Sequence, residues 1–358
     1  MRKIKKTARK LLKKHIIKAM SFVLSLCLTF TVFSGIPMNV NSLESAKQSQ
    51  SGEILADENS KAEEKIEDTR YEEYVLSEIP EELKINEDVK NAVGLDTSDA
   101  EKLTSLTTIN KDGSKSLKIY NAPIKYIEKS SGKVKFINNK IKKSQKINGN
   151  KKYLYENSAS NIKTYFPENI EDGILVSSDD QSVEMTPINA KYIKRSNKKI
   201  TVDEEGFKTK RAKKAKLKKD YAEYGEAFGK STYIEYAPIG TGIKENIVLE
   251  KYTGQNEFSF ILSVPGAKPA NMKGKEILFV DAETGKEVFN INEIFAYDSG
   301  SDIDGERKEC YNNSYKIEKI SEGKYLLTSI IDSEFLKSKT TLYPVTIDPY
   351  LVFFNDFC

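Results

Sequence analysis

Regular alternation of large apolar and small side chains along one short segment limits the fold more than any other feature of this sequence. From Phe258 to Val264, large apolar residues occupy every second position, and the positions between them hold Ser, Ile and Ser. Successive side chains of a β-strand point to opposite faces of the sheet, so this spacing puts the large side chains on one face. The pattern therefore predicts a strand whose aromatic and aliphatic side of the sheet faces a core.

Short segments of this kind, separated by turns, recur from residue 105 onward. The predicted strands are 117–120, 134–137, 153–155, 276–280, 287–291, 325–330 and 341–347. Turn residues at this spacing indicate a mainly β fold, with antiparallel sandwich-like or irregular β domains. The residues that we expect in the core, and not in a site, are Tyr233, Tyr236, Ile247, Leu249, Phe258, Phe260, Tyr343, Val345 and Ile347.

The first 42 residues have the layout of a secretory signal. Residues 1–18 contain nine Lys and Arg and no acid, and an apolar run from Met20 to Phe33 follows. That run is shorter than the roughly 20 residues that a spanning helix needs. The layout favours a cleaved signal peptide over an uncleaved anchor. We therefore expect a secreted or cell-wall-associated protein that meets the membrane only through this N-terminal segment during export.

Removal of the signal changes the charge and excludes several kinds of chemistry. The whole chain has a net charge of +4, whereas the residues after 42 comprise 48 basic and 53 acidic side chains. His15, the only histidine, lies within the signal. A His-dependent triad, a Cys–His pair and a His-ligated zinc are therefore excluded from the remainder, and we expect no cofactor. Cys310 and Cys358 could form one disulfide, or Cys358 could link two chains.

Composition divides the chain into segments. After the signal at 1–42, residues 43–104 are polar and acidic and predict a largely disordered spacer that could include one short helix. The further predicted boundaries are a first β region at 105–200, a basic connector at 201–220, a second β domain at 221–350 and the truncated start of a further domain at 351–358.

The basic connector is the one charge run with a possible binding role. Its cations are Lys208, Lys210, Arg211, Lys213, Lys214, Lys216, Lys218 and Lys219. They could contact a polyanion such as an anionic cell-wall polymer, or they could form a solvated connector between domains. No aromatic residue interleaves the run for base stacking, so we expect no nucleic-acid partner.

A second candidate site is a group of acidic residues near a pair of glycines. Asp298, Asp302 and Asp304 are weak calcium candidates, because Gly300 stands where a calcium loop would place a ligand. The alternative is an acidic hairpin loop. The sequence contains no Gly-x-Ser-x-Gly elbow, and its carboxylates are too scattered to nominate a catalytic pair, so we predict no catalytic residues.

Several sequence blocks together resemble a known family. They are 161–167, 172–174, 224–229, 233–236, 242–249, 251–254, 257–260 and 343–349. In this order they resemble the N-terminal region of large secreted, wall-associated RHS or YD-repeat proteins, and of related DNRLRE-domain proteins, from Gram-positive bacteria. The resemblance covers most of residues 105–349. The sequence departs from the family pattern at Tyr350 and in 351–358, which predicts a truncated chain.

This resemblance implies a non-catalytic, β-rich structural or interaction module of a surface protein, and not an enzyme. Its implied partners are anionic wall polymer or downstream RHS or YD-repeat domains. Two alternatives remain open at this point. One is an adhesin-like binder of wall polymer or of a host surface. The other is a carboxylate-based wall glycan hydrolase, which would need two acids facing each other across a cleft.

Overall fold

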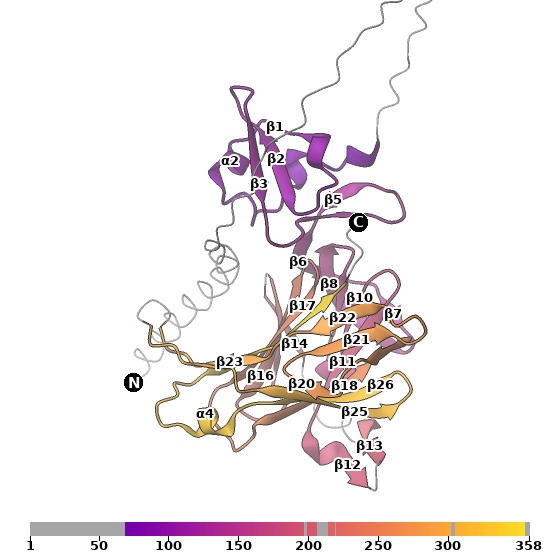
Figure 1. The fold of residues 1–358 in the computed structure, drawn as a ribbon, viewed down its shortest axis with the longest axis vertical. Coiled ribbons are helices and arrows are strands. Elements are labelled where there is room, and N and C mark those ends of the chain that lie inside the picture. The colour runs from indigo at the N-terminus through magenta and orange to yellow at the C-terminus, as the bar shows by residue number, and fades with distance from the viewer. Residues whose placement is uncertain (1–68, 197–198, 206–213, 219, 302–304, 355–358) are drawn as a thin grey trace, which may run out of the picture. The chain divides into compact units, whose positions relative to one another are not determined.

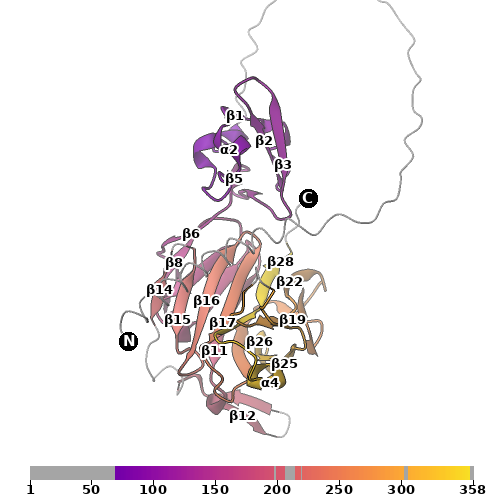
Figure 2. The ribbon, with the colours of Figure 1, turned by 90° about the vertical axis from the view of Figure 1, so that its left-hand side faces the viewer.

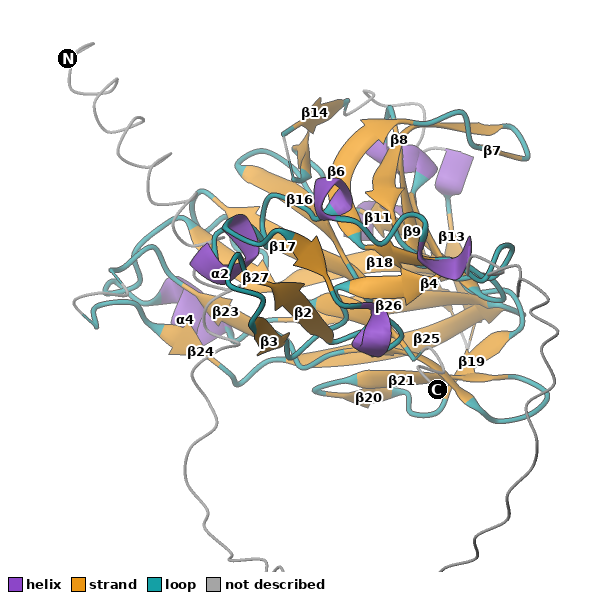
Figure 3. Cartoon of the chain, turned by 90° about the horizontal axis from the view of Figure 1, so that it is seen from above, coloured by secondary structure: helices purple, strands orange, loops and turns teal. Residues whose placement is uncertain are grey.

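The computed structural model describes residues 69–354 apart from 197–198, 206–213, 219 and 302–304 (Figure 1). The predicted signal segment therefore lies outside the described residues. Within them, strands predominate and pair antiparallel, which confirms the predicted mainly β fold (Figure 3). No helix among the described residues is long and apolar enough to cross a membrane. We call residues 69–137 the N-terminal module and residues 138–354 the β body.

The N-terminal module combines short helices with small sheets. Its helical elements are η1 (Thr69–Tyr71), η2 (Leu76–Glu78), α2 (Glu87–Lys90) and η3 (Thr97–Asp99). Its strands are β1 (Gly94–Leu95), β2 (Ser105–Ile109), β3 (Lys115–Ile119), β4 (Lys125–Ile127) and β5 (Val134–Phe136). Strands β1–β2–β3 form one sheet and β4–β5 another.

The module has its own apolar core, and this corrects one prediction. The core consists of Tyr74, Ile79, Leu83, Val89, Ala100, Leu106, Ile124, Val134 and Phe136. Five of these nine residues precede residue 105, in the segment predicted to be a largely disordered spacer. Residues 69–104 instead bury their sparse apolar side chains against β2, β5 and Ile124. Few apolar residues suffice here because the later strands supply the rest of the core.

One large sheet of the β body has the strand order β20-β25-β26-β18-β11-β10-β9-β8-β6, with β7 paired to β8. Its strands are β6 (Asn138–Lys143), β7 (Ile147–Asn148), β8 (Lys151–Ala159), β9 (Lys163–Pro167), β10 (Ile174–Ser177), β11 (Ser182–Ile188), β18 (Glu257–Ser263), β20 (Lys273–Gly274), β25 (Ser314–Ser321) and β26 (Lys324–Ile330).

The second large sheet has the order β14-β15-β16-β17-β28-β22-β21-β19, of which Figure 2 shows β14 to β17 side by side. Strands β23, β24 and β27 join it off this path. Its strands are β14 (Ala215–Leu217), β15 (Ala222–Gly225), β16 (Thr232–Ile239), β17 (Gly242–Leu249), β19 (Ala267–Pro269), β21 (Ile277–Asp281), β22 (Glu287–Ile291), β23 (Phe295–Tyr297), β24 (Glu309–Cys310), β27 (Val345–Asp348) and β28 (Tyr350–Phe353).

The remaining elements of the body are short. They are η4 (Ile170–Asp172), η5 (Ala190–Tyr192), α4 (Ser333–Lys337) and the hairpin β12 (Ile193–Ser196) and β13 (Lys199–Val202). The hairpin contributes Ile193, Ile200 and Val202 to a small apolar cluster around Ile261 and Leu326. Strand β18 is therefore buried on both of its faces.

A single apolar cluster joins the two large sheets of the body. Phe279 of one sheet meets Tyr325 of the other at a ring-centroid distance of 5.8 Å. The Tyr224 hydroxyl donates to the Pro167 carbonyl oxygen across the same interface, at 2.8 Å. Strands from the predicted first β region and second β domain pair directly, as β11 does with β18. The predicted division at 201–220 therefore does not separate two domains, because long-range pairing places both regions in one sheet.

Seven of the nine predicted core residues are buried, and two are not. Tyr233 is half-exposed because the alternation in β16 turns Thr232, Ile234 and Tyr236 inward and Tyr233 to the opposite face. Tyr343 is also half-exposed and packs against the edge of the core cluster. Its hydroxyl donates to the Leu336 carbonyl oxygen at 2.7 Å.

Strand β28 lies within the second sheet, between β17 and β22. Leu351 and Phe353 are each 2% exposed. The prediction that these residues start a further, truncated domain is therefore wrong for 351–353. The strand follows β27 after a single residue, Pro349, and both strands pair with β17. Residues 355–358, including Cys358, lie outside the described residues.

Candidate functional site

The predicted polyanion-contact run is only partly described. Lys208, Lys210, Arg211, Lys213 and Lys219 lie outside the described residues. Of the others, Lys214 pairs with Glu168 at 2.7 Å and Lys216 with Glu223 at 3.0 Å. Lys216 lies on β14 and Lys218 follows it, and β14 pairs with β15. In the described part of the run, ion pairs thus offset two of the three cations.

The calcium candidates are described only at Asp298, since Asp302 and Asp304 fall outside the described residues. Asp298 is buried, and its carboxylate accepts three backbone N–H groups. Oδ1 accepts from Gly300 at 2.9 Å and from Lys308 at 3.0 Å, and Oδ2 accepts from Leu342 at 3.0 Å. This arrangement ties the loop after β23 to the segment before β27. No group of three or more His, Cys, Asp or Glu side chains placed to hold a metal occurs among the described residues.

A buried carboxyl group that the sequence analysis missed lies in the β body core. Glu245 of β17 is 5% exposed and stands directly opposite Tyr236 of β16 in the strand register. Among the described residues, its Oε2 has no hydrogen-bond partner. Burial raises the pKa of Glu245 to about 8, and the Tyr236 hydroxyl offsets this only in part. Glu245 is therefore largely neutral at pH 7.

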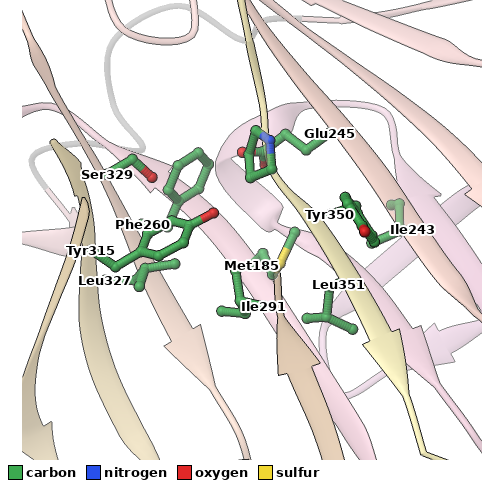
Figure 4. Close-up of a pocket in the computed structure, with 11 residues that line it drawn as sticks. Met185, Ile243, Glu245, Phe260, Ile291, Tyr315, Leu327, Ser329, Tyr350 and Leu351 are labelled. Atoms are coloured by element: carbon green, nitrogen blue, oxygen red, sulfur yellow. The ribbon is translucent and has the colours of Figure 1, made fainter. Parts of the chain in front are cut away.

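Glu245 borders a small cavity between the two sheets (Figure 4). The cavity has a volume of about 20 Å³, and its other lining residues are mostly apolar, including Ile243, Phe260 and Leu351. This volume holds about one water molecule. The cavity is too small for a substrate. Glu245 is therefore a buried core residue that a macromolecule cannot contact.

An ion pair occupies the opposite face of the same strand. Lys244 Nζ lies 2.7 Å from Asp348 Oδ2, and the side chains are 20% and 5% exposed. Burial raises the pKa of Asp348, although the Lys244 ammonium lowers it again in part. The aspartate belongs to the Asp-Pro pair that ends β27. The Lys244–Asp348 ion pair links β17 to the end of β27.

A third feature, also missed from the sequence, is a concentration of lysines at one edge of the first sheet. Residues 138–167 contain seven lysines and one acid. We call these seven the lysine edge: Lys140, Lys142, Lys143, Lys146, Lys151, Lys152 and Lys163. They lie on β6, β8, β9 and the turns that join them, and β6 is the last strand of its sheet. In sequence they are spread over 24 positions, so they do not form an obvious charge run.

Tyrosines lie among these lysines. Lys146 Nζ stands 5.3 Å from the centroid of the Tyr165 ring, which is half-exposed. The ring centroid of buried Tyr153 lies 6.0 Å from that of Tyr165. The Tyr153 hydroxyl donates to Glu184 Oε2 at 3.0 Å. Burial, together with the Glu184 carboxylate, raises the pKa of Tyr153. The mixture of cations and an accessible ring is typical of surfaces that bind nucleic acid.

The lysine edge is the feature of the described residues best placed to meet a macromolecule. Unlike Glu245, it is on the surface. Unlike the calcium candidates, it is described at every position. Its chemistry is recognition of phosphate or another polyanion, because ammonium groups supply charge and hydrogen bonds and no reactive nucleophile is among them at neutral pH.

Comparison with known proteins finds relatives that are named nucleases. The chain is 29% identical over 289 residues to the tRNA3(Ser)-specific nuclease WapA of Bacillus spizizenii. It is 41% identical over 108 residues to the tRNA nuclease WapA of Bacillus subtilis strain 168. The first match covers 77% of this chain and 12% of the relative, and the second covers 30% and 4%. No family model matches the sequence, and no solved structure is similar to it.

These names correct three predictions. The expected non-catalytic structural or interaction module is contradicted, because the relatives are named nucleases. The expectation that the chain is no part of an enzyme is contradicted for the same reason. The expected absence of a nucleic-acid partner conflicts with relatives named for tRNA. That last prediction rested on the lack of aromatics in the 208–219 run, whereas the lysine edge has Tyr165 beside Lys146.

Proposed function

We propose that this chain belongs to a protein that cleaves tRNA. The supporting observation is the 29% identity over 289 residues to a protein named as a tRNA-specific nuclease. The match extends over most of the chain and is not confined to a short motif. The chain spans about an eighth of that relative's length. The proposal therefore concerns the activity of the protein as a whole.

The test uses the native protein and the 358-residue chain side by side. Antibodies raised against the chain capture the native protein from cultures of the producing organism. The captured protein is incubated with a mixed tRNA pool, and new RNA ends are mapped by sequencing. A parallel reaction uses the purified chain alone, and a mock capture with pre-immune serum is the control.

Cleavage at discrete tRNA positions by the captured protein, absent from the mock capture, is the expected result. Cleavage by the purified chain as well would place the catalytic groups within these 358 residues. Cleavage by the captured protein alone would place them elsewhere in the polypeptide. Intact tRNA in both reactions would refute the proposed function.

We also propose that the protein is exported and related to wall-associated RHS or DNRLRE proteins. The support is the arrangement of basic and apolar residues in 1–42 and the ordered sequence blocks in 161–349. Mass spectrometry of the mature protein in the wall and medium fractions tests export. We expect the N-terminus near residue 43, and an unprocessed Met1 in the cytoplasmic fraction alone would contradict it.

A further inference from the structure

The lysine edge carries a large local excess of positive charge. Within residues 138–167 the lysines outnumber acids by seven to one, whereas the segment after residue 42 is acidic overall. The edge is thus a local region of opposite sign to its surroundings. Lysines on an edge strand also prevent sheets from pairing edge to edge, so charge alone does not demonstrate a ligand.

The acids near the edge are already shared among its cations. Glu156 lies 3.6 Å from Lys142 Nζ and 3.8 Å from Lys163 Nζ. Glu184 of β11 pairs with Lys151 and accepts the Tyr153 hydroxyl. Even with these two acids counted, five positive charges remain in excess. Lys143, Lys146 and Lys152 are all exposed, so part of this excess faces solvent.

The geometry adds a feature that edge protection does not require. Tyr165 lies in the same cross-strand row as Glu156, and Lys146 stands over its ring. A half-exposed ring with an ammonium group beside it can stack a base or sugar while neighbouring lysines contact phosphates. Strand protection needs the charges and does not need the ring.

Resting on the proposed function, we infer that the lysine edge binds the phosphodiester backbone of tRNA. The bound RNA is contacted by the exposed lysines of the β6–β8 turn region and by Tyr165. The contact is electrostatic and independent of sequence, because lysines meet phosphates and no donor or acceptor pattern for base edges is present. It holds substrate to the protein and cleaves no bond.

Binding is measured by fluorescence anisotropy with 3′-labelled tRNA and the full 358-residue chain, between 50 and 200 mM salt. The test variant is K143Q/K146Q/K152Q. We expect its affinity at about 100 mM salt to fall about 10- to 100-fold, and the slope of log K against log salt to decrease by about 2 to 3. The matched control K230Q/K251Q/K339Q removes three exposed lysines elsewhere on the body and should change affinity less than about twofold.

Three results would overturn the inference. One is the absence of salt-dependent tRNA binding by the wild-type chain. Another is an equal loss of affinity in the test and control variants, which would indicate only a general charge effect. The third is a K143Q/K146Q/K152Q variant that binds tRNA as tightly as the wild-type chain and with the same salt dependence, which would show that these lysines do not contact the RNA. Circular dichroism of each variant confirms that its strands are retained.

This test is separate from the test of the proposed function. If captured protein cleaves tRNA but the purified chain does not bind it at the lysine edge, the inference fails and the nuclease proposal stands. If binding is found and no cleavage occurs in any fraction, the nuclease proposal fails and the site remains. The two outcomes are therefore distinguishable.

Discussion

Among the buried ionisable side chains, Lys125 of the N-terminal module and Glu245 of the β body make a pair of opposite sign. In the body, Glu245 is 5% exposed, and burial raises its pKa to about 8. In the module, Lys125 is fully buried, and burial lowers its pKa to about 8. The cause is the same, because removal from water disfavours whichever form is charged. The consequence for stability differs, because one group is neutral when protonated and the other when deprotonated.

The surroundings of the two groups also differ. Lys125 Nζ donates to the Asp99 carbonyl oxygen at 3.2 Å and stands 5.0 Å from the Tyr74 ring centroid. Asp99 raises the lysine pKa in part and so opposes desolvation. Glu245 has a cavity and Tyr236 beside it, and one of its oxygens has no hydrogen-bond partner in the part of the chain that the structure describes. The module thus provides more polar contacts for Lys125 than the body provides for Glu245.

The largest expected effect tests whether the two regions are stabilised independently. Phe353→Ala removes a side chain that is 2% exposed and whose ring centroid lies 5.5 Å from that of Phe289. We expect it to destabilise the body by about 3 to 5 kcal/mol. Hydrogen exchange should speed up in β17 and β22 and stay unchanged in β2 and β3 of the module. Equal acceleration in both regions would show that they unfold as one unit.

The matched control for this substitution is the next residue. Phe354 is 44% exposed, and Phe354→Ala should cost less than about 1 kcal/mol. Similar losses from both substitutions would show that β28 is not packed between β17 and β22 in solution.

The second effect concerns the pH dependence of the body. The folded-state pKa of Glu245 lies above the value in the unfolded chain, so its contribution to stability is full below about pH 4.5. It is lost as pH rises through about 8. Glu245→Gln removes this loss and should make the body more stable than wild type at pH 9, by about 3 kcal/mol, with little difference at pH 4. Urea unfolding at the two pH values measures this.

Glu250 provides the control for that experiment. It is an exposed glutamate that immediately follows the same strand, and Glu250→Gln should leave the pH dependence of body stability unchanged. If the wild-type and Glu245→Gln curves run parallel from pH 4 to pH 9, the carboxyl group is not buried as described.

The smallest effect concerns the stability of the module, which the buried Lys125 should make rise with pH, whereas Glu245 makes the stability of the body fall. The folded-state pKa of Lys125 is lowered, so its cost is full below about pH 8 and disappears as pH approaches the unfolded value near 10.5. Lys125→Met should stabilise the module at pH 7 by about 1 to 2 kcal/mol, because the lost contact with Tyr74 offsets part of the gain. Hydrogen exchange of β2 measures it.

The comparison variant is Lys111→Met, which alters an exposed lysine in a turn of the same module. It should leave β2 exchange at pH 7 unchanged. Faster exchange in Lys125→Met than in wild type would mean that the ammonium stabilises the module, contrary to the stated cause.

Local patterns predicted the class of fold and several strands, but not how the strands assemble. The alternation in 258–264 correctly assigned Phe258 and Phe260 to a core face. It could not show that β18 lies between β11 and β26, since that depends on pairing across more than 60 residues. The same long-range pairing removed the predicted boundary between two β domains. Tyr233 was misplaced because a shift of one residue exchanges the faces of a strand.

The candidate site was less predictable than the fold. The run at Lys208–Lys219 was predicted as a polyanion contact because its charges are close together in the sequence. The lysine edge is interrupted by Asn, Ser, Tyr and Ile, so it shows no run. Strand pairing then brings Lys146 to Tyr165 and Lys151 to Glu184. A count of lysines against acids over 138–167 was the one sequence signal that could have found it.

The sequence by itself determined the β class, the inward stripe of 258–264 and the exclusion of histidine chemistry after residue 42, because these depend on side-chain period and composition alone. Only the tertiary structure decided that Tyr350–Phe353 is an interior strand, that Glu245 is buried beside Tyr236 and that scattered lysines share one edge. Burial and electrostatic neighbours are set by contacts between distant segments, and those contacts have no signature in local sequence.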